Sequence, residues 1–213
     1  MKVAILGTGG IGLATAAWLA HHGHVPVLWS PSGAGTRELA AGESLRYSGK
    51  IEGECRPEVA SSAAGAVADA DVILVAVPGN GHRTVMEAAA PHIRPGQVVI
   101  INSLCSLSAL YLSRLLAERG VEVPIATWGT TVLTARRRSG TEVAIMTVRT
   151  SLHVATLPVS QAAVGLGICR TLFGDRFIEQ SDVLATSLIN INPVAHLGLA
   201  LGNLTRMERG ENW

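Results

Sequence analysis

The chain has 213 residues with a formal net charge of +1, and 48% of them are hydrophobic while 15% are charged. This is enough apolar material for one good-sized core, and the balanced charge excludes a general attraction to nucleic acid or to an anionic membrane. Cys55, Cys105 and Cys169 lie far apart without C-x-x-C spacing, which excludes a disulfide framework and a zinc site, so no metal is expected. With no apolar stretch of about 18 residues to span a membrane, we expect a cytoplasmic protein whose partners are small molecules.

A glycine-rich motif near the N-terminus is the strongest signal. An apolar run over residues 3–6 leads into this motif, and an alanine-rich stretch follows it. The G-x-G-x-x-G spacing between a strand and a helix predicts a dinucleotide cradle, because glycines allow the sharp turn, the close approach of a diphosphate and the close packing of the helix. The N-terminus of that helix adds N–H groups and the positive end of its dipole. The expected cofactor contacts are Gly7, Thr8, Gly9, Gly10, Ile11 and Gly12.

The second predicted strand, residues 25–29, ends without a carboxylate. Folds of this kind that prefer NAD place an acid there for the ribose hydroxyl, whereas NADP needs polar or cationic groups. Ser30, Ser32 and Arg37 supply such groups. We therefore expect NADP(H) as the preferred cofactor and NAD(H) as the alternative, with a purely solvated position as the alternative for Arg37.

Strand and helix patterns then alternate with short links. Residues 45–56 show irregular β-structure, which a hairpin would explain. After them we expect helices at 62–70, 81–93 and 107–119, alternating with strands at 72–77, 98–101 and 121–127. Continuous apolar strands between helices are typical of a doubly wound, mostly parallel sheet. Ligands of such sheets lie at the carboxyl ends of the strands, so Val77, Pro78, Asn102 and Ser103 are expected to line the cofactor.

The pattern changes after residue 130. Residues 132–138 and 142–150 read as an added β-hairpin, and the three arginines at 136–138 are expected to form a solvated face. A helix at 158–173 and a short strand at 176–179 complete the sheet. The fold class is therefore α/β, with a nucleotide-binding Rossmann-type domain over residues 1–181.

The last segment, residues 182–213, is expected to be an apolar helix leading into a truncated C-terminal helical domain. It begins at the N-cap residue Asp182 and is nearly all apolar, which indicates burial under a further domain or in a homodimer. Asn192 and His196 share one face of it at i, i+4 spacing. A histidine can exchange protons near neutral pH, so His196 is either a catalytic acid or a structural histidine bonded to a carbonyl.

The stretch Ser187-Leu-Ile-Asn-Ile-Asn-Pro-Val-Ala-His196, together with the glycine loop and the strand ending at Val77-Pro78, resembles the opine dehydrogenase family, the octopine and nopaline synthase group. The resemblance covers essentially the whole chain. It implies that an imine formed from an amino acid and an α-keto acid is reduced by NAD(P)H to a secondary amine dicarboxylate. His196 is then the proton donor and acceptor, with Asn192 beside it.

Two departures from that family leave open whether the chain is active by itself. Leu197 stands where members commonly have proline, and the aspartate that orients the histidine belongs to a C-terminal domain that this chain does not include. Other reductases that resemble this Rossmann start use a catalytic lysine, and none follows Lys50. A 3-hydroxyacyl-CoA dehydrogenase-like enzyme, with Glu142 as the acid paired to His196, and a non-catalytic NADP-binding module or truncated remnant are the remaining alternatives. The identity of the amino acid and keto acid is not encoded in any motif of the chain.

Overall fold

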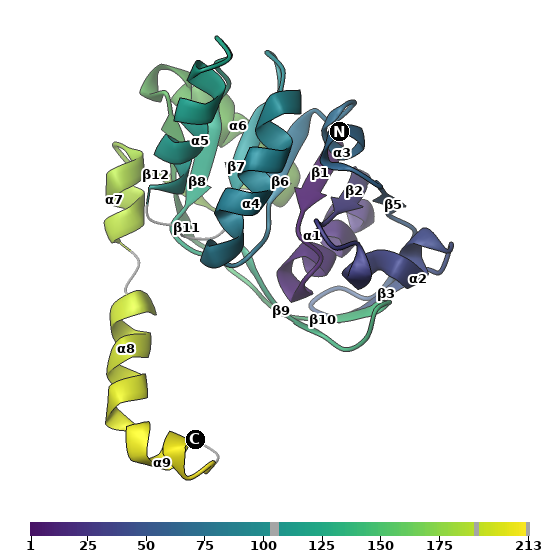
Figure 1. The fold of residues 1–213 in the computed structure, drawn as a ribbon, viewed down its shortest axis with the longest axis vertical. Coiled ribbons are helices and arrows are strands. Elements are labelled where there is room, and N and C mark those ends of the chain that lie inside the picture. The colour runs from purple at the N-terminus through teal and green to yellow at the C-terminus, as the bar shows by residue number, and fades with distance from the viewer. Residues whose placement is uncertain (103–106, 190–191, 212–213) are drawn as a thin grey trace.

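The computed structural model describes residues 1–102, 107–189 and 192–211. Within these residues the chain forms an eight-stranded sheet with helices on both faces, and a smaller four-stranded sheet beside it (Figure 1). The α/β fold class is confirmed. We call residues 1–189 the body and residues 192–211 the C-terminal helices.

The large sheet has the strand order β12-β11-β8-β7-β6-β1-β2-β5 and is parallel except where β11 pairs with β8. From β1 the chain moves outward to β2 on one side and then returns to β6 on the other. This reversal places a switch point between β1 and β6, where ligands of open α/β sheets bind. The strands are β1 (Lys2–Leu6), β2 (Val25–Trp29), β5 (Glu58–Val59), β6 (Val72–Val75), β7 (Val98–Ile101), β8 (Ile125–Trp128), β11 (Leu152–Leu157) and β12 (Phe177–Glu179).

Two hydrophobic cores lie on opposite faces of this sheet. One packs α1 and α6 with the small sheet, and the other packs α3, α4 and α5. Successive residues of β1 show the division, since Ile5 points into the first core and Leu6 into the second. The helices are α1 (Gly10–His21), α2 (Arg37–Ala40), α3 (Ala63–Val67), α4 (Gly79–Ala89), α5 (Ser108–Ala117) and α6 (Ala162–Phe173).

The small sheet joins two predicted hairpins into one structure. β3 (Leu45–Gly49) pairs antiparallel with β4 (Gly53–Cys55), and β9 (Leu133–Arg137) pairs antiparallel with β10 (Glu142–Val148). The sequence pattern predicts two separate hairpins. In the structure β10 pairs in parallel with β3, and both pack on α1. Because that pairing joins segments far apart in the chain, no local sequence pattern predicts it.

Two boundaries of the large sheet differ from the prediction. The expected strand at 121–127 begins only at Ile125, because Pro124 lacks the N–H that a ladder needs. The strand β11, Leu152–Leu157, was missed altogether, since residues 142–150 were connected directly to the helix at 158. β11 bridges β8 and β12, so this short strand completes one end of the sheet.

The C-terminal segment contains α7 (Val183–Leu188), α8 (Asn192–Gly202) and α9 (Leu204–Glu208). The Asp182 carboxylate accepts the N–H groups of Leu184 and Ala185, both at 2.8 Å, which confirms the predicted N-cap. α7 belongs to the body, because Val183 is part of a buried core. α8 and α9 extend away from the body (Figure 1).

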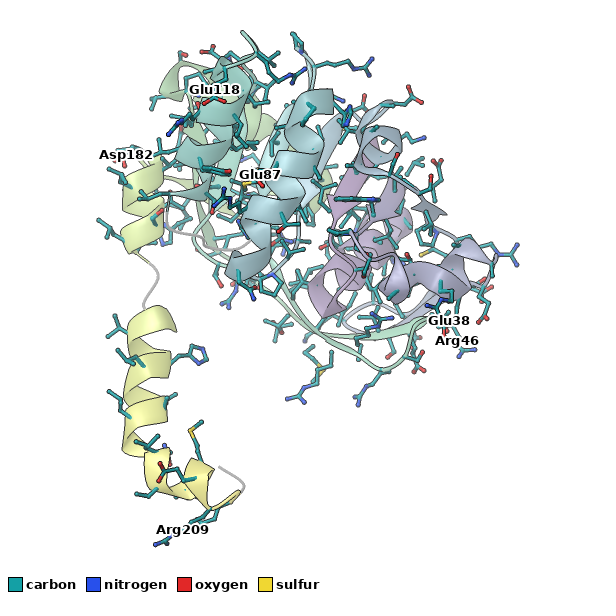
Figure 2. All side chains as sticks on the ribbon, in the orientation of Figure 1. Glu38, Arg46, Glu87, Glu118, Asp182 and Arg209 are labelled. Carbon is teal, nitrogen blue, oxygen red and sulfur yellow. The ribbon has the colours of Figure 1, made fainter. Side chains whose placement is uncertain are left out.

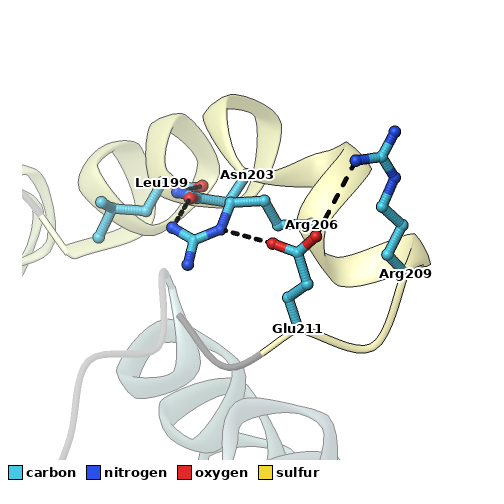
Figure 3. A network of polar contacts seen from close by, with 5 residues as sticks. All are labelled: Leu199, Asn203, Arg206, Arg209 and Glu211. Carbon is cyan, nitrogen blue, oxygen red and sulfur yellow. Dashed lines mark hydrogen bonds and ion pairs between the residues drawn. The ribbon is translucent and has the colours of Figure 1, made fainter.

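The described side chains of α8 and α9 are mostly exposed in the single chain, so their burial under a further domain or in a homodimer stays a prediction. Val194 is 72% exposed and Leu201 is 64% exposed, since no described part of the body covers them. Polar contacts within the C-terminal helices hold their end together, as Figure 3 shows. Asn203 Nδ2 donates to the Leu199 carbonyl at 2.9 Å, and the Arg206 guanidinium pairs with Glu211 at 3.2 Å. Among the residues that the structure describes, no helix is long and apolar enough to cross a membrane.

Candidate nucleotide-binding site

The glycine loop is tightly packed at its two ends and open in the middle. A Cβ added to Gly7, whose φ is +133°, would lie 2.4 Å from the Ala76 carbonyl oxygen, and one added to Gly12 would lie 2.0 Å from the Gly7 carbonyl oxygen. A Cβ on Gly9 would meet no heavy atom within 4 Å. The loop therefore has the shape that a diphosphate cradle needs, because only its central glycine faces open space.

Helix α1 begins at the open side of this loop. Gly9 is its N-cap and has no side chain to accept the N–H groups of the first turn, while its carbonyl accepts from Leu13 at 3.0 Å. The N–H groups of Gly10, Ile11 and Gly12 are thus available to a ligand. Together with the positive end of the helix dipole, they form an anion site built from backbone.

A cavity of about 210 Å³ opens beside the loop, at the carboxyl ends of β1, β6 and β7. It brings together residues from the glycine loop and from both strand ends that the sequence singled out. Thr131 is an addition, since it follows β8 and carries no motif. The lining residues are Gly9, Gly10, Ile11, Ala76, Val77, Pro78, Asn102 and Thr131. None of these side chains titrates, so the cavity can bind and orient a ligand but holds no acid or base of its own.

Asn102 has an unusual position in this cavity. Its side chain is 1% exposed, and its Nδ2 donates to Thr15 Oγ1 at 3.4 Å. Its Oδ1 has no hydrogen-bond partner among the described residues. Because a buried acceptor without a partner is costly, Asn102 is suited to accept a hydrogen bond from a ligand. The open cradle and this free oxygen both fit a dinucleotide. Ser103, the neighbouring predicted contact, lies outside the described residues.

The buried residue His82 holds the strand end in place. Its Nε2 lies 3.1 Å from the Val77 carbonyl and its Nδ1 lies 3.1 Å from Ser108 Oγ. Burial lowers the pKa of His82, which favours the neutral ring. Since a carbonyl only accepts, the neutral ring donates from Nε2 to Val77 and accepts the Ser108 hydroxyl at Nδ1. No sequence motif singles out His82, because it lies within α4.

The loop after β2 lies against the glycine loop. Thr8 Oγ1 donates to Ser30 Oγ at 3.2 Å, and Ser32 Oγ accepts the Ala34 N–H at 3.4 Å. Arg37 is exposed, and its side chain makes no hydrogen bond or ion pair with the described residues. Arg137 reaches this region instead, which corrects the expectation that the three arginines form only a solvated face. Its guanidinium donates to the Thr8 carbonyl at 3.1 Å because β9 runs past the start of α1.

The two described cysteines are not nucleophiles. Burial raises the pKa of Cys55 to about 11 and that of Cys169 to about 12. Both thiols therefore stay protonated near neutral pH. Within the described residues, no three His, Cys, Asp or Glu side chains gather as metal ligands would.

His196 and Asn192 are not brought to the cavity. His196 is exposed on α8, which extends away from the sheet edge that carries the glycine loop (Figure 1). Asn192 is the first residue of α8, and its side chain lies outside the described residues. The structure thus brings six of the predicted cofactor residues to one cavity, and it places α8, which carries the predicted catalytic pair, apart from that cavity.

Comparison with known proteins places this site in context. Residues 2–106 match the family model of the NAD-dependent glycerol-3-phosphate dehydrogenase N-terminus. Over 210 residues, 97% of the chain, the sequence is 31% identical to an opine dehydrogenase from Arthrobacter sp. (strain 1C). The chain spans 58% of the length of that relative.

Solved structures show the same fold. An octopine dehydrogenase solved with NADH and pyruvate superposes with a TM-score of 0.80 at 18% identity, over 91% of this chain and 53% of that one. A yersinopine dehydrogenase with NADP+ bound superposes with a TM-score of 0.74 at 19% identity, over 94% of this chain and 52% of that one. The chain is therefore similar to an opine dehydrogenase over nearly its whole length, and it contains an NAD(P)-binding domain with the fold seen in octopine dehydrogenase.

Proposed function

We propose that the chain is the nucleotide-binding part of an NAD(P)H-dependent opine dehydrogenase. In this proposal an amino acid and an α-keto acid form an imine, which is reduced to a secondary amine dicarboxylate. The observation that carries the proposal is the 31% identity to an opine dehydrogenase along 97% of the chain, which includes α7 and α8. The similarity to glycerol-3-phosphate dehydrogenases is confined to about half of the chain, for example 98 residues at 38% identity.

The residues of the body would bind and orient the cofactor. The N–H groups at the start of α1 would hold the diphosphate, and Asn102 Oδ1 would accept a hydrogen bond at the inner end of the cavity. When bound, the reduced nicotinamide supplies a hydride to the imine carbon. The cavity walls at Ile11 and Val77 would exclude water from one face of the nicotinamide ring.

His196 would donate the proton that the amine nitrogen gains. Two observations support this role: the histidine ends the stretch that resembles the opine dehydrogenases, and its ring is exposed to a substrate. Asn192 lies one helical turn before it and would hydrogen-bond to the ring or to the substrate. Proton donation by His196 requires that its imidazole lies close to the nicotinamide and the imine in the active enzyme.

The test is NADPH and NADH oxidation, followed by absorbance, with a panel of amino acids and either pyruvate or 2-oxoglutarate. It should be run on the chain and on any longer product of the same reading frame. Oxidation that needs both co-substrates supports the proposal, and loss of a general acid, as in His196→Gln, should lower kcat by about 10²- to 10⁴-fold with an unchanged Kd for NADPH. Equal turnover in the variant would remove His196 from the mechanism.

A second candidate is a nucleotide-binding module without amine chemistry. It is favoured by the cavity lining, which contains no titratable side chain, and by the exposed position of His196. This candidate predicts tight NADPH binding with no oxidation for any co-substrate pair in either version of the protein. The same assay therefore separates the two functions.

A further inference from the structure

Arg137 ties together two loops that lie more than a hundred residues before it in the chain. Its Nη1 donates to the Thr8 carbonyl at 3.1 Å and its Nη2 donates to the Gly35 carbonyl at 3.0 Å. Its Nε donates to the Ser139 carbonyl at 2.8 Å, which fixes the plane of the guanidinium. The side chain of a strand in the small sheet thus lies across the junction between the glycine loop and the loop after β2.

The charge of this guanidinium is not neutralised within the described residues. All three of its hydrogen bonds go to neutral carbonyls, and none of the described ion pairs includes it. Each Nη atom carries a second N–H that these bonds do not use. Because Arg137 is exposed, those N–H groups and the positive charge can reach a bound anion.

The loop between β2 and α2 is the part of this fold that distinguishes the ribose hydroxyl of NAD from the 2′-phosphate of NADP. Ser30 lies in it and contacts Thr8, the residue whose carbonyl Arg137 holds. The first carboxylate after β2 is Glu38, whose Oε2 packs against Gly140 in the β9–β10 turn. Figure 2 shows Glu38 at the edge of the molecule where α2 and the small sheet meet. An arginine and two hydroxyls thus border the junction of the two loops, and the Glu38 carboxylate at the nearby turn makes no ion pair with Arg137 in the described residues.

We propose that Arg137 is the residue that selects NADP(H) over NAD(H), by binding the 2′-phosphate together with Ser30. The inference rests on the proposed nucleotide-binding function and replaces Arg37 with Arg137 as the selecting cation. Arginine binds phosphate through paired, charge-assisted hydrogen bonds. Its bonds to the Thr8 and Gly35 carbonyls hold the side chain in place before the ligand arrives, so little rotamer freedom is lost on binding.

Binding titrations test the inference without any turnover. The Kd values of NADPH and NADH are measured by nicotinamide fluorescence, and 2′,5′-ADP and 5′-AMP serve as competing probes that differ by the 2′-phosphate. Loss of hydrogen bonds to a charged group should make Arg137→Gln weaken NADPH and 2′,5′-ADP by about 10- to 100-fold, with little change for NADH and 5′-AMP. Arg137→Lys keeps the charge and should retain part of the preference.

Arg37→Gln is the matched control, because Arg37 is exposed near the same loop and its side chain makes no hydrogen bond or ion pair with the described residues. It should change neither Kd. Equal weakening of NADPH and NADH in Arg137→Gln, with an unchanged melting temperature, would overturn the inference and leave Arg137 as a loop tie. A selective loss of NADPH in Arg37→Gln, or unchanged binding in both variants, would overturn it as well. If the unmodified chain binds neither nucleotide, the proposed function fails first.

Discussion

The body and the C-terminal helices are both rich in apolar residues, but the body buries them and the C-terminal helices expose them. In the body, Leu74 and Ile100 are fully buried between two layers of helices. In α8, Leu197 is 60% exposed and Leu199 is 53% exposed, although the helix is as apolar as a buried one. An apolar helix pattern therefore indicates that a helix needs to be covered, but it does not indicate which element covers it.

The two regions also divide the chemistry. The body has a site made mostly of backbone, in which glycines and one buried asparagine face a cavity. α8 has the residues that the family resemblance marks as catalytic, and it lies apart from that cavity.

The largest contrast is expected between two leucine truncations. Leu74→Ala removes side-chain atoms from a fully buried position in β6, and the lost burial and the remaining cavity should lower the free energy of unfolding by about 2 to 5 kcal/mol. Leu201→Ala, at a position that is 64% exposed, should change it by less than about 0.5 kcal/mol. Urea unfolding followed by circular dichroism measures both. Similar losses in the two variants would mean that α8 is covered in solution.

Glycine substitutions sharpen the same comparison at the site. A methyl group on Gly12 would overlap the Gly7 carbonyl, so Gly12→Ala should abolish measurable NADPH binding and lower the melting temperature. Gly198→Ala meets no heavy atom within 4 Å and should raise helix stability by about 0.5 to 1 kcal/mol without changing the Kd. Fluorescence titration and thermal unfolding give the two readouts. Normal nucleotide binding by Gly12→Ala would disprove the cradle.

A smaller effect is expected from pH. Burial holds the pKa of His82 below that of the unfolded chain, so as pH falls through about 6.5 the unfolded state takes up a proton that the folded state resists. The body should therefore lose stability as pH is lowered from about 7.5 to about 5.5, and His82→Gln should flatten that dependence. His92→Gln, at an exposed position, is the control. Parallel stability curves for the unmodified chain and His82→Gln would contradict this role.

Association through α8 remains a prediction. If two copies cover each other's leucines, sedimentation should show a dimer whose population falls when Leu197 and Leu201 are replaced by glutamate. A monomer at all concentrations would leave the helices exposed in solution.

Those parts of the fold that depend on local pattern were predicted well. β2 and β7 were predicted to the residue, because each is an apolar run next to glycine or proline. The hairpins were found from their turns. The pairing of β10 with β3 was not, because a register between distant strands leaves no local signal.

The site follows the same rule. The glycine loop could be found because one spacing fixes both its backbone shape and its ligand. Arg137 could not be assigned from the sequence, because its position depends on β9 lying beside α1. Arg37 is the first cation after β2, so the sequence favours it instead. The composition of α8 indicates that the helix needs a covering partner, and the identity of that partner stays a prediction.

Hydrogen exchange with and without NADPH tests the central claim most directly, namely that the backbone of the body forms the nucleotide site. We predict slower exchange in peptides that contain residues 7–15, 30–36 and 133–138, and unchanged exchange in peptides from 194–211. Protection confined to residues 194–211, with none at the glycine loop, would contradict the account.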